Sequence, residues 1–516
     1  MTITNLNKKT KIVIIIGVML GILLASLDGT IVATAMPKII NSLKGFDYYT
    51  WPMTAYLLCM TISMPLFGKL ADIYGFKPIY IFGIAIFLAG SVLCGISQNM
   101  LQFIVFRGLQ GIGGGILISN AMAIIGILFA PAERAKYGGF VSSAAGLSSL
   151  IGPILGGLIT DNLSWRWIFY VNVPLGIIAM AILICAFPSY KETQERKKID
   201  YMGAASLIIS LVPMLLALTW GGKTYAWSSI QIIGILVFSI IMLVVFGFIE
   251  TKASDPIIPM SLFQNSIFNF SAIEMFLLNA VLMGSSIFIP LFLQGVIGST
   301  ASKSGAIITP MLVSLIVGVI TTGLLVSKTC KYKVLAFIGF VIMSIGTVLL
   351  SLMGVKTGST QVVMVMVIMG IGIGTVMNIF NVTAQNAFSQ NQIGVVTSSI
   401  QFFSRMGQTI ASTVLGTIMS TSMSNSIHNL DISSLPANVT ELLKNPNTIS
   451  NSQALNAIKD QIPEDMLPSF GKLMEQIKQI LSNSIHQVFV ICAVITITAL
   501  IIVLFMKEIP LKSDLG

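Results

Sequence analysis

The chain has 516 residues, of which 55% are hydrophobic and only 9% are charged, and its mean hydropathy is +0.91. Soluble domains carry roughly 25% charged residues, so this composition excludes a soluble globular protein. The formal net charge of +10 does not indicate binding to nucleic acid, because the Lys and Arg residues lie in short connections between apolar runs, where they set membrane orientation.

Apolar runs long enough to cross a bilayer recur along almost the whole chain. A spanning helix needs about 20 mostly apolar residues, and helices satisfy their own backbone polar groups inside a membrane. We therefore predict an all-α polytopic membrane protein. The fourteen predicted spans are 12–33, 49–68, 78–96, 100–129, 137–160, 167–187, 201–221, 229–249, 267–295, 304–326, 333–354, 361–388, 395–420 and 486–506.

The distribution of basic residues predicts the orientation. With the N-terminus in the cytoplasm, most of the 29 Lys and Arg residues fall in cytoplasmic connections. An even number of spans then places both termini in the cytoplasm. The first apolar run is too long for a signal peptide and lacks a cleavage site, so we expect it to remain as the first span.

A weak internal repeat indicates two similar halves. KPIYIFG (77–83) and KVLAFIG (333–339) share a Lys and a Gly, and GIGGG (111–115) recurs as GIGIG (370–374). Duplicated halves are a common plan of transporters, with the binding site at their interface. The alternative is coincidence among small apolar residues.

The repeat and the span count predict three parts. Residues 1–200 form an N-terminal six-helix bundle, 201–250 form two additional transmembrane helices, and 251–516 form a C-terminal six-helix bundle. The segment 421–485 is too polar to span. We expect it to be an external loop with one or two surface helices.

Three charged side chains inside apolar runs are candidates for proton coupling. Asp28 and Glu274 are acids in a region where an ion is costly, so either can carry a proton, and Asp28 could exchange it for a cationic substrate. The alternative for Asp28 is an interfacial acid that reaches water. The third candidate is Arg107, for which a purely structural role is the alternative. Arg405 is the other basic residue left within a span.

A polar face is predicted in the span at 361–388. Asn378, Asn381 and Gln385 lie at positions i, i+3 and i+7, which share one side of a helix. This face suits the lining of a water-filled cavity. Hydrogen bonding to neighbouring helices is an equal alternative.

Five motifs occur in order on the predicted spans. They are LDGTIVATAMP (27–37), GKLADIYGFKP (68–78), RGLQGIGGG (107–115), GLSSLIGPILGG (146–157) and WRWIFYVNVP (165–174). Together they resemble the signatures of the drug:proton antiporter branch with fourteen spans in the major facilitator superfamily. The resemblance implies a fold of two six-helix bundles plus two extra central helices, and it implies that Arg107 supports proton coupling near the first span.

The resemblance also assigns a conformational gate to Gly68, Asp72, Gly75 and Lys77. Glycines permit a tight turn, and Asp72 at a helix end can accept hydrogen bonds from the N-terminus of a neighbouring helix. In the family, this aspartate helps hold the two halves in the outward-open state. Ile73 and Phe76 stand where basic residues are usual. A solvated turn that only orients the protein is the alternative.

The fourth motif resembles the antiporter motif of exporters and contains Ser148, Gly152, Pro153, Gly156 and Gly157. Ser148, Gly152 and Gly156 recur at intervals of four, which allows close helix approach, and Pro153 favours a kink. Ser148 replaces the usual glycine.

The sequence thus predicts a proton-coupled antiporter that exports lipophilic, cationic drugs by alternating access. No nucleotide-binding loop, zinc-ligand spacing or nucleophile motif stands out, so we predict neither an enzyme nor a cofactor. The expected partners are lipophilic substrates, protons and the lipid bilayer of a bacterial inner membrane. We expect a monomer, and a need for an adaptor protein stays open.

Two alternatives remain from the sequence. The first is an exporter of one specific solute, such as tetracycline, a lipid or a metabolite. The second is a membrane receptor that does not transport, which the buried acids disfavour.

Overall fold

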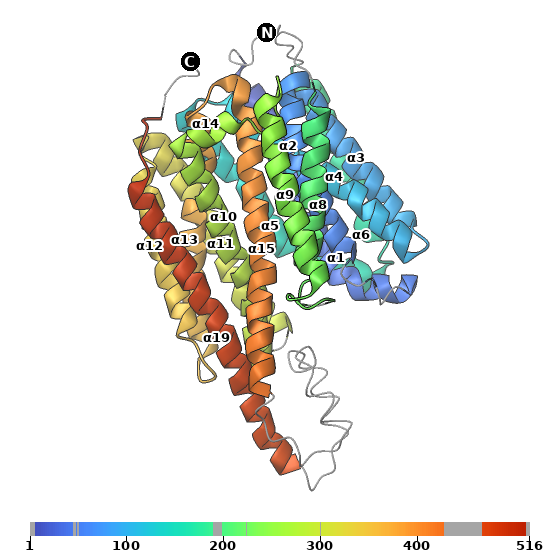
Figure 1. Ribbon diagram of the computed structural model, residues 1–516, viewed down its shortest axis with the longest axis vertical. Coiled ribbons are helices and arrows are strands. Elements are labelled where there is room, and N and C mark those ends of the chain that lie inside the picture. The colour runs from blue at the N-terminus through green and yellow to red at the C-terminus, as the bar shows by residue number, and fades with distance from the viewer. Residues whose placement is uncertain are drawn as a thin grey trace.

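The structure is a computed structural model built from long helices (Figure 1). It describes residues 6–44, 48, 51–188, 199–222, 224–299, 301–427 and 467–511. The principal helices are α1 Lys8–Leu43, α2 Trp51–Tyr74, α3 Phe76–Ile96, α4 Met100–Leu128, α5 Pro131–Asn162, α6 Trp167–Tyr170, α7 Asn172–Ala186, α8 Tyr201–Trp220, α9 Ile230–Lys252, α10 Ser266–Leu291, α11 Ala301–Thr329, α12 Lys333–Ser351, α13 Ser359–Val376, α14 Ile379–Asn386, α15 Ile393–Ile427 and α19 Leu467–Phe505.

Short polar side chains begin several of these helices. The Asn99 side chain accepts a hydrogen bond from Gln102 N at 2.9 Å, and Asn265 accepts one from Ile267 N at 2.9 Å. The first N–H groups of a helix have no partner within it, so a cap of this kind fixes where the helix starts. The apolar runs that follow place their remaining backbone bonds inside the helix, as a membrane requires.

Within the described residues, thirteen helices are long and apolar enough to cross a membrane. The all-α polytopic fold is therefore confirmed. The predicted span at 395–420 lies in α15, which is helical but carries many polar side chains, so fourteen crossings stay a prediction. The predicted span at 361–388 is divided into α13 and α14, with Asn378 at the break.

The helices pack into two groups that follow the chain, one of α1 to α7 and one of α10 to α19. Residues from 14 to 187 form two hydrophobic clusters, and the largest cluster is formed mainly by residues 207–511. Contacts between the groups run chiefly from α5 to α11 and from α2 and α4 to α15. Helices α8 and α9 pack against each other, and α8 contacts α2 and α15. The division at 200 and 250 stays a prediction.

The segment at 421–485 differs from its prediction as one external loop. Helix α15 continues to Ile427, and α19 begins at Leu467, so only residues 428–466 lie outside the described part. Leu473, Ile477 and Leu481 form a buried face on α19 at intervals of four. The end of the segment is therefore an extension of the last span, and Figure 1 shows this helix projecting beyond its neighbours.

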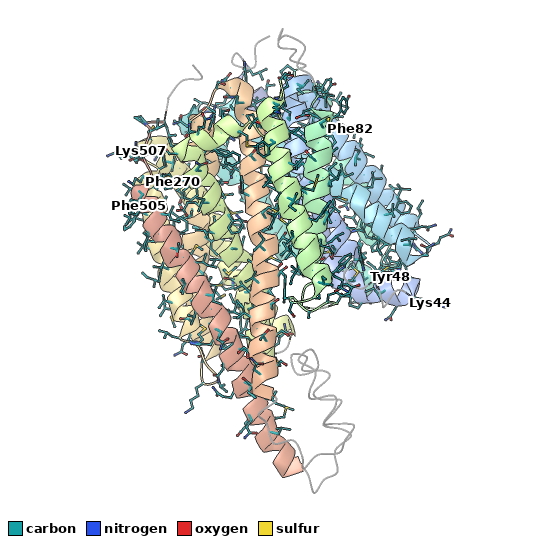
Figure 2. All side chains as sticks on the ribbon, in the orientation of Figure 1. Lys44, Tyr48, Phe82, Phe270, Phe505 and Lys507 are labelled. Atoms are coloured by element: carbon teal, nitrogen blue, oxygen red, sulfur yellow. The ribbon has the colours of Figure 1, made fainter. Side chains whose placement is uncertain are left out.

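Apolar side chains cover the outside of the bundle. Figure 2 shows Phe82 and Phe505 at the periphery, and 70% of Phe505 is exposed. On α9, Ile240, Val244 and Phe248 are more than half exposed. An apolar exterior of this extent suits lipid contact.

Candidate functional site

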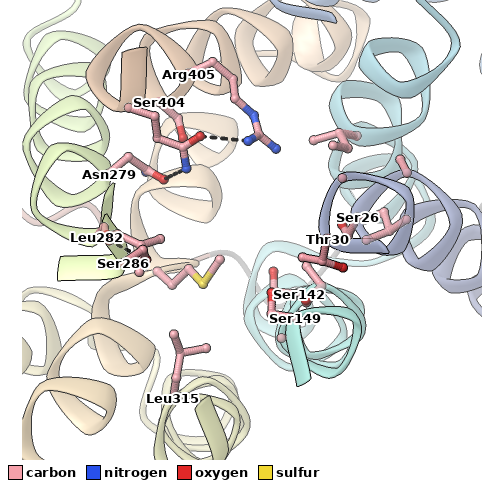
Figure 3. Close-up of a pocket in the computed structure, with 18 of the residues that line it drawn as sticks. Ser26, Thr30, Ser142, Ser149, Asn279, Leu282, Ser286, Leu315, Ser404 and Arg405 are labelled. Atoms are coloured by element: carbon pink, nitrogen blue, oxygen red, sulfur yellow. Dashed lines mark hydrogen bonds between the residues drawn. The ribbon is translucent and has the colours of Figure 1, made fainter. Parts of the chain in front are cut away.

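A cavity of about 590 Å³ lies between α1, α2, α4 and α5 on one side and α10, α11, α14 and α15 on the other (Figure 3). Its lining residues are Ile22, Ala25, Ser26, Gly29 and Thr30 of α1, Tyr56, Leu57 and Met60 of α2, Ile118 and Met122 of α4, Ser142, Ala145, Gly146 and Ser149 of α5, Met275, Asn279, Leu282, Ser285, Ser286, Ile289 and Pro290 of α10, Ile308, Met311, Leu312 and Leu315 of α11, Met377, Asn378 and Asn381 beside α14, and Gln401, Ser404, Arg405 and Gln408 of α15. Its volume is typical of a site for a drug-sized molecule, and most of its wall is apolar with a few hydroxyl and amide groups.

Asp28 points away from this cavity and forms a buried ion pair with Arg107. Asp28 Oδ2 lies 2.5 Å from Arg107 Nη1, and the two residues are 2% and 0% exposed. Gln110 closes the network, because its Nε2 donates to Asp28 Oδ1 at 2.8 Å while its Oε1 accepts from Arg107 Nη1 at 2.7 Å. Each charge is thus neutralised by the other, as a buried pair requires.

Asn172 at the start of α7 adds a third contact to the carboxylate. Its Nδ2 lies 3.5 Å from Asp28 Oδ1 and 3.0 Å from Ser91 Oγ, to which it donates. The ion-pair network therefore joins four helices, α1, α3, α4 and α7.

Tyr56 connects the ion pair to the cavity. The Arg107 guanidinium stacks 4.2 Å from the centre of the Tyr56 ring, and the Tyr56 hydroxyl donates to Ala25 O at 3.0 Å. Tyr56 itself lines the cavity. A rearrangement of the ion pair would therefore reach the cavity wall through one side chain.

Glu274 is the second acid predicted within a span, and it lies on α10 with 0% exposure. Neither carboxylate oxygen has a hydrogen-bond partner among the residues that the structure describes. Its neighbour Met275 lines the cavity, but Glu274 does not. The structure thus separates the two acids, one with a full set of partners and one with none among the described residues.

The three polar residues predicted on one face have different surroundings. Asn378 and Asn381 line the cavity, and Asn378 Oδ1 accepts from Ser142 Oγ at 2.8 Å. Gln385 does not line it. Its Nε2 donates to Met122 O at 3.0 Å and Thr397 Oγ1 at 2.9 Å, which ties α14 to α4 and α15.

Helix α5 packs closely on α1 through its glycine motif. A Cβ added at Gly152 would overlap the Thr30 hydroxyl, and one at Gly156 would lie 3.1 Å from Ile31 O. The Ser148 hydroxyl donates to Ala144 O at 2.8 Å and to Leu23 O at 3.3 Å. Helix α5 continues through Pro153, and a Cβ at Gly157 would meet no atom of the described residues within 4 Å. The same helix thus contacts the segment that holds Asp28.

The predicted gate residues lie where α2 meets α15. Asp72 Oδ1 accepts from Gly394 N at 3.0 Å, and Oδ2 accepts from Val395 N at 2.8 Å. A carboxylate at a helix N-terminus binds free N–H groups and the positive end of the helix dipole. Gly68 faces Ser398 one turn further along α15.

The remaining two gate residues lie at the start of α3. Gly75 has φ of 93°, a conformation that glycine adopts readily, and it forms the turn between α2 and α3. Lys77 Nζ donates to Ile184 O at 2.8 Å and also to Phe187 O, so it binds the C-terminal end of α7.

Comparison with known proteins identifies the fold. The family model of the Major Facilitator Superfamily matches residues 18–412. The chain belongs to the major facilitator superfamily. Human organic anion transporter MFSD10 (TETRAN) has a similar solved structure, with a TM-score of 0.60 at 12% identity, covering 94% of this chain and 99% of that one. At that identity the likeness concerns the fold alone.

Relatives within the superfamily have names that describe efflux. The chain is 37% identical to the multidrug transporter protein MdtP of Bacillus subtilis, over 98% of this chain and 94% of that protein. It is 36% identical to multidrug resistance protein 3 of the same organism, over 99% and 98%. A rubrofusarin-specific efflux pump of Gibberella zeae is 31% identical over 77% and 74%. These similarities support an efflux transporter of the major facilitator superfamily.

Sequence reasoning assigned no role to several residues of the site. Gln110 lies three residues after Arg107 and so shares its helix face, a signal that was available. Asn172 lies in the fifth motif, but nothing in the sequence directs its side chain toward Asp28. Arg405 stood out as a charge within a span, without an indication that it lines a cavity.

Proposed function

We propose that this efflux transporter is a proton-coupled antiporter that exports lipophilic molecules by alternating access. The observation that supports it most is a buried Asp28–Arg107 ion pair that shares α1 and Tyr56 with a drug-sized cavity. No nucleotide-binding motif in the sequence offers another energy source.

Protonation of Asp28 is the proposed coupling step. A proton on the carboxylate removes the counterion of Arg107, and a buried charge without a partner is strongly unfavourable. The protonated state therefore favours a different packing of α1 against α4. Because Gly152 and Gly156 hold α5 against α1, a movement of α1 is transmitted to α5, which contacts α11 of the other group.

The cycle follows from the direction of the proton gradient. A proton from outside neutralises Asp28, with Glu274 as a second proton site, and the protein releases its substrate outward. Loss of the proton to the cytoplasm restores the ion pair and favours the state in which the cavity opens to the cytoplasm and binds the next molecule. The contact of Asp72 with α15 closes one end of the cavity in one state and opens in the other.

The proposed substrates are lipophilic and varied, because most of the cavity wall is apolar and contains flexible Met side chains such as Met60, Met122 and Met311. The cationic preference predicted from Asp28 rests on the sequence alone, since Arg107 holds that carboxylate outside the cavity. We place the protein in the cytoplasmic membrane of a bacterium as a monomer, with both termini inside.

Proton movement in energised inverted vesicles tests the proposal. Addition of a lipophilic dye to vesicles with the wild-type protein is expected to release protons from the lumen, and Asp28→Asn is expected to abolish this release at equal expression. Dye transport that persists unchanged after the proton gradient is collapsed would contradict proton coupling.

A further inference from the structure

A second Arg–Gln network lies in the cavity wall on α15. Arg405 Nη1 donates to Gln408 Oε1 at 2.8 Å, and Gln408 Nε2 donates to Asn279 Oδ1 at 3.0 Å. All three residues line the cavity. Figure 3 shows the Arg405 guanidinium extending away from α15 toward the opposite wall.

This network resembles the one around Asp28, because in both an arginine donates to a glutamine three residues later and that glutamine donates to a neighbouring helix. Arg107 and Gln110 belong to RGLQ, and the α15 network belongs to RMGQ (405–408). In the first network the glutamine amide donates to the Asp28 carboxylate at 2.8 Å. In the second it donates to the Asn279 amide oxygen. The first network contains its own anion, and the second does not.

The charge of Arg405 is therefore uncompensated within the described part of the chain. The described residues that line the cavity include no Asp or Glu, and the described ion pairs do not include Arg405. Its Nε is buried and has no hydrogen-bond partner among the described residues. A guanidinium in a largely apolar wall is costly, and an anion in the cavity would offset that cost.

We propose that the cavity binds amphiphiles that carry an acidic group, such as a carboxylate, phosphate or sulfonate, and that Arg405 binds this group. This inference rests on the export function proposed above and names its substrate class. Gln408, which donates to Asn279, accepts one hydrogen bond from the guanidinium and leaves its other donors for the ligand. Guanidinium donors match the oxygens of a carboxylate or phosphate in a two-pronged geometry. Ile289, Leu312 and Leu315 supply apolar surface for the rest of the molecule.

A matched pair of dyes tests the acidic group alone. Rhodamine B carries a free carboxylate on a lipophilic cation, and its ethyl ester lacks the carboxylate. Fluorescence anisotropy with the purified full-length protein measures the affinity for each dye without any need for transport. The wild type is expected to bind rhodamine B about tenfold more tightly than the ester, the effect of one charge-assisted contact.

Three variants assign this preference to Arg405. Arg405→Gln is expected to make the two dyes bind equally. Asn279→Asp keeps Arg405 but places a carboxylate beside Gln408, so it is expected to reduce the preference by supplying an internal anion. Lys328→Gln, at an exposed basic residue near the end of α11, is the control and is expected to retain the preference.

The results separate this inference from the proposed function. Equal affinities in the wild type, no binding of rhodamine B, or a preference that survives Arg405→Gln would overturn the inference, whatever the transport data. Selective binding of rhodamine B without proton-driven flux would support the role of Arg405 and contradict the proton-coupled function instead.

Discussion

Asp28 and Arg107 neutralise each other inside the protein, with Oδ2 and Nη1 2.5 Å apart. Gln110 hydrogen-bonds to both partners, and Tyr56 covers the guanidinium on the side of the cavity. The carboxylate is therefore not exposed as a binding group for substrate. Its protonation state instead determines whether Arg107 has a counterion, which makes the pair suited to switching a helix arrangement.

Removal of the Asp28 charge alone is expected to destabilise the protein. Asp28→Asn leaves Arg107 buried without a counterion, and breaking such a pair costs about 3 to 5 kcal/mol. The double variant Asp28→Asn with Arg107→Gln removes both charges and is expected to regain most of the lost thermal stability without regaining proton coupling. Thermal unfolding in detergent measures this, and equal melting temperatures for the single and double variants would contradict it.

Glu274 is expected to behave differently from Asp28. Its carboxylate oxygens have no hydrogen-bond partner in the described part of the chain, so Glu274→Gln leaves no opposite charge there uncompensated. We expect the melting temperature of Glu274→Gln to equal or exceed that of the wild type, measured beside Asp28→Asn. A loss of stability as large as that of Asp28→Asn would mean that Glu274 has a partner in the folded protein.

The glycines of α5 provide a matched test of the contact with α1. Gly152→Ala places a methyl group against Thr30, and overpacking of this kind costs about 1 to 3 kcal/mol. Gly157→Ala points into open space and serves as the control. Dye efflux from cells, normalised to expression, is expected to fall for Gly152→Ala only. Equal efflux in the two variants would exclude a role for the close contact.

The Asp72 contact is expected to slow hydrogen exchange at two backbone N–H groups of α15. Asp72→Asn replaces a charged cap with a neutral one at Gly394 and Val395, a loss of about 1 kcal/mol, or roughly fivefold in the opening equilibrium. Hydrogen–deuterium exchange of the peptide around Gly394 is expected to accelerate by this factor. Asp161→Asn, an exposed acid paired with Lys38, is the control. Unchanged exchange in Asp72→Asn would show that the carboxylate does not hold α15.

The fold could be predicted largely from the sequence because each span needs a long apolar run. The span predicted at 395–420 lies in helix α15, which is polar because Gln401, Ser404, Arg405 and Gln408 face the cavity. The structure differs from the prediction at the start of α19. The start of α19 looked like a surface helix because half of its residues are polar, whereas its apolar face packs inside the protein.

The site could be predicted only in part because periodicity reports which residues share a helix face, not what that face meets. The positions of Asp28 and Arg107 inside apolar runs marked both as costly charges. Their mutual distance depends on how α1 and α4 are rotated toward each other, which one helix pattern does not contain. The same limit explains why Gln385 shares a predicted face with Asn378, although Gln385 binds Met122 O and Thr397 Oγ1 and does not line the cavity.

The measurement that tests the central claim most directly separates substrate exchange from proton coupling in proteoliposomes. Purified wild-type protein is expected to accumulate dye in acid-loaded vesicles and also to exchange labelled for unlabelled dye at equal pH. Asp28→Asn is expected to retain exchange, because Asp28 does not line the cavity, and to lose accumulation driven by the pH gradient. Accumulation by Asp28→Asn at the wild-type level would contradict the role of the Asp28–Arg107 pair in coupling.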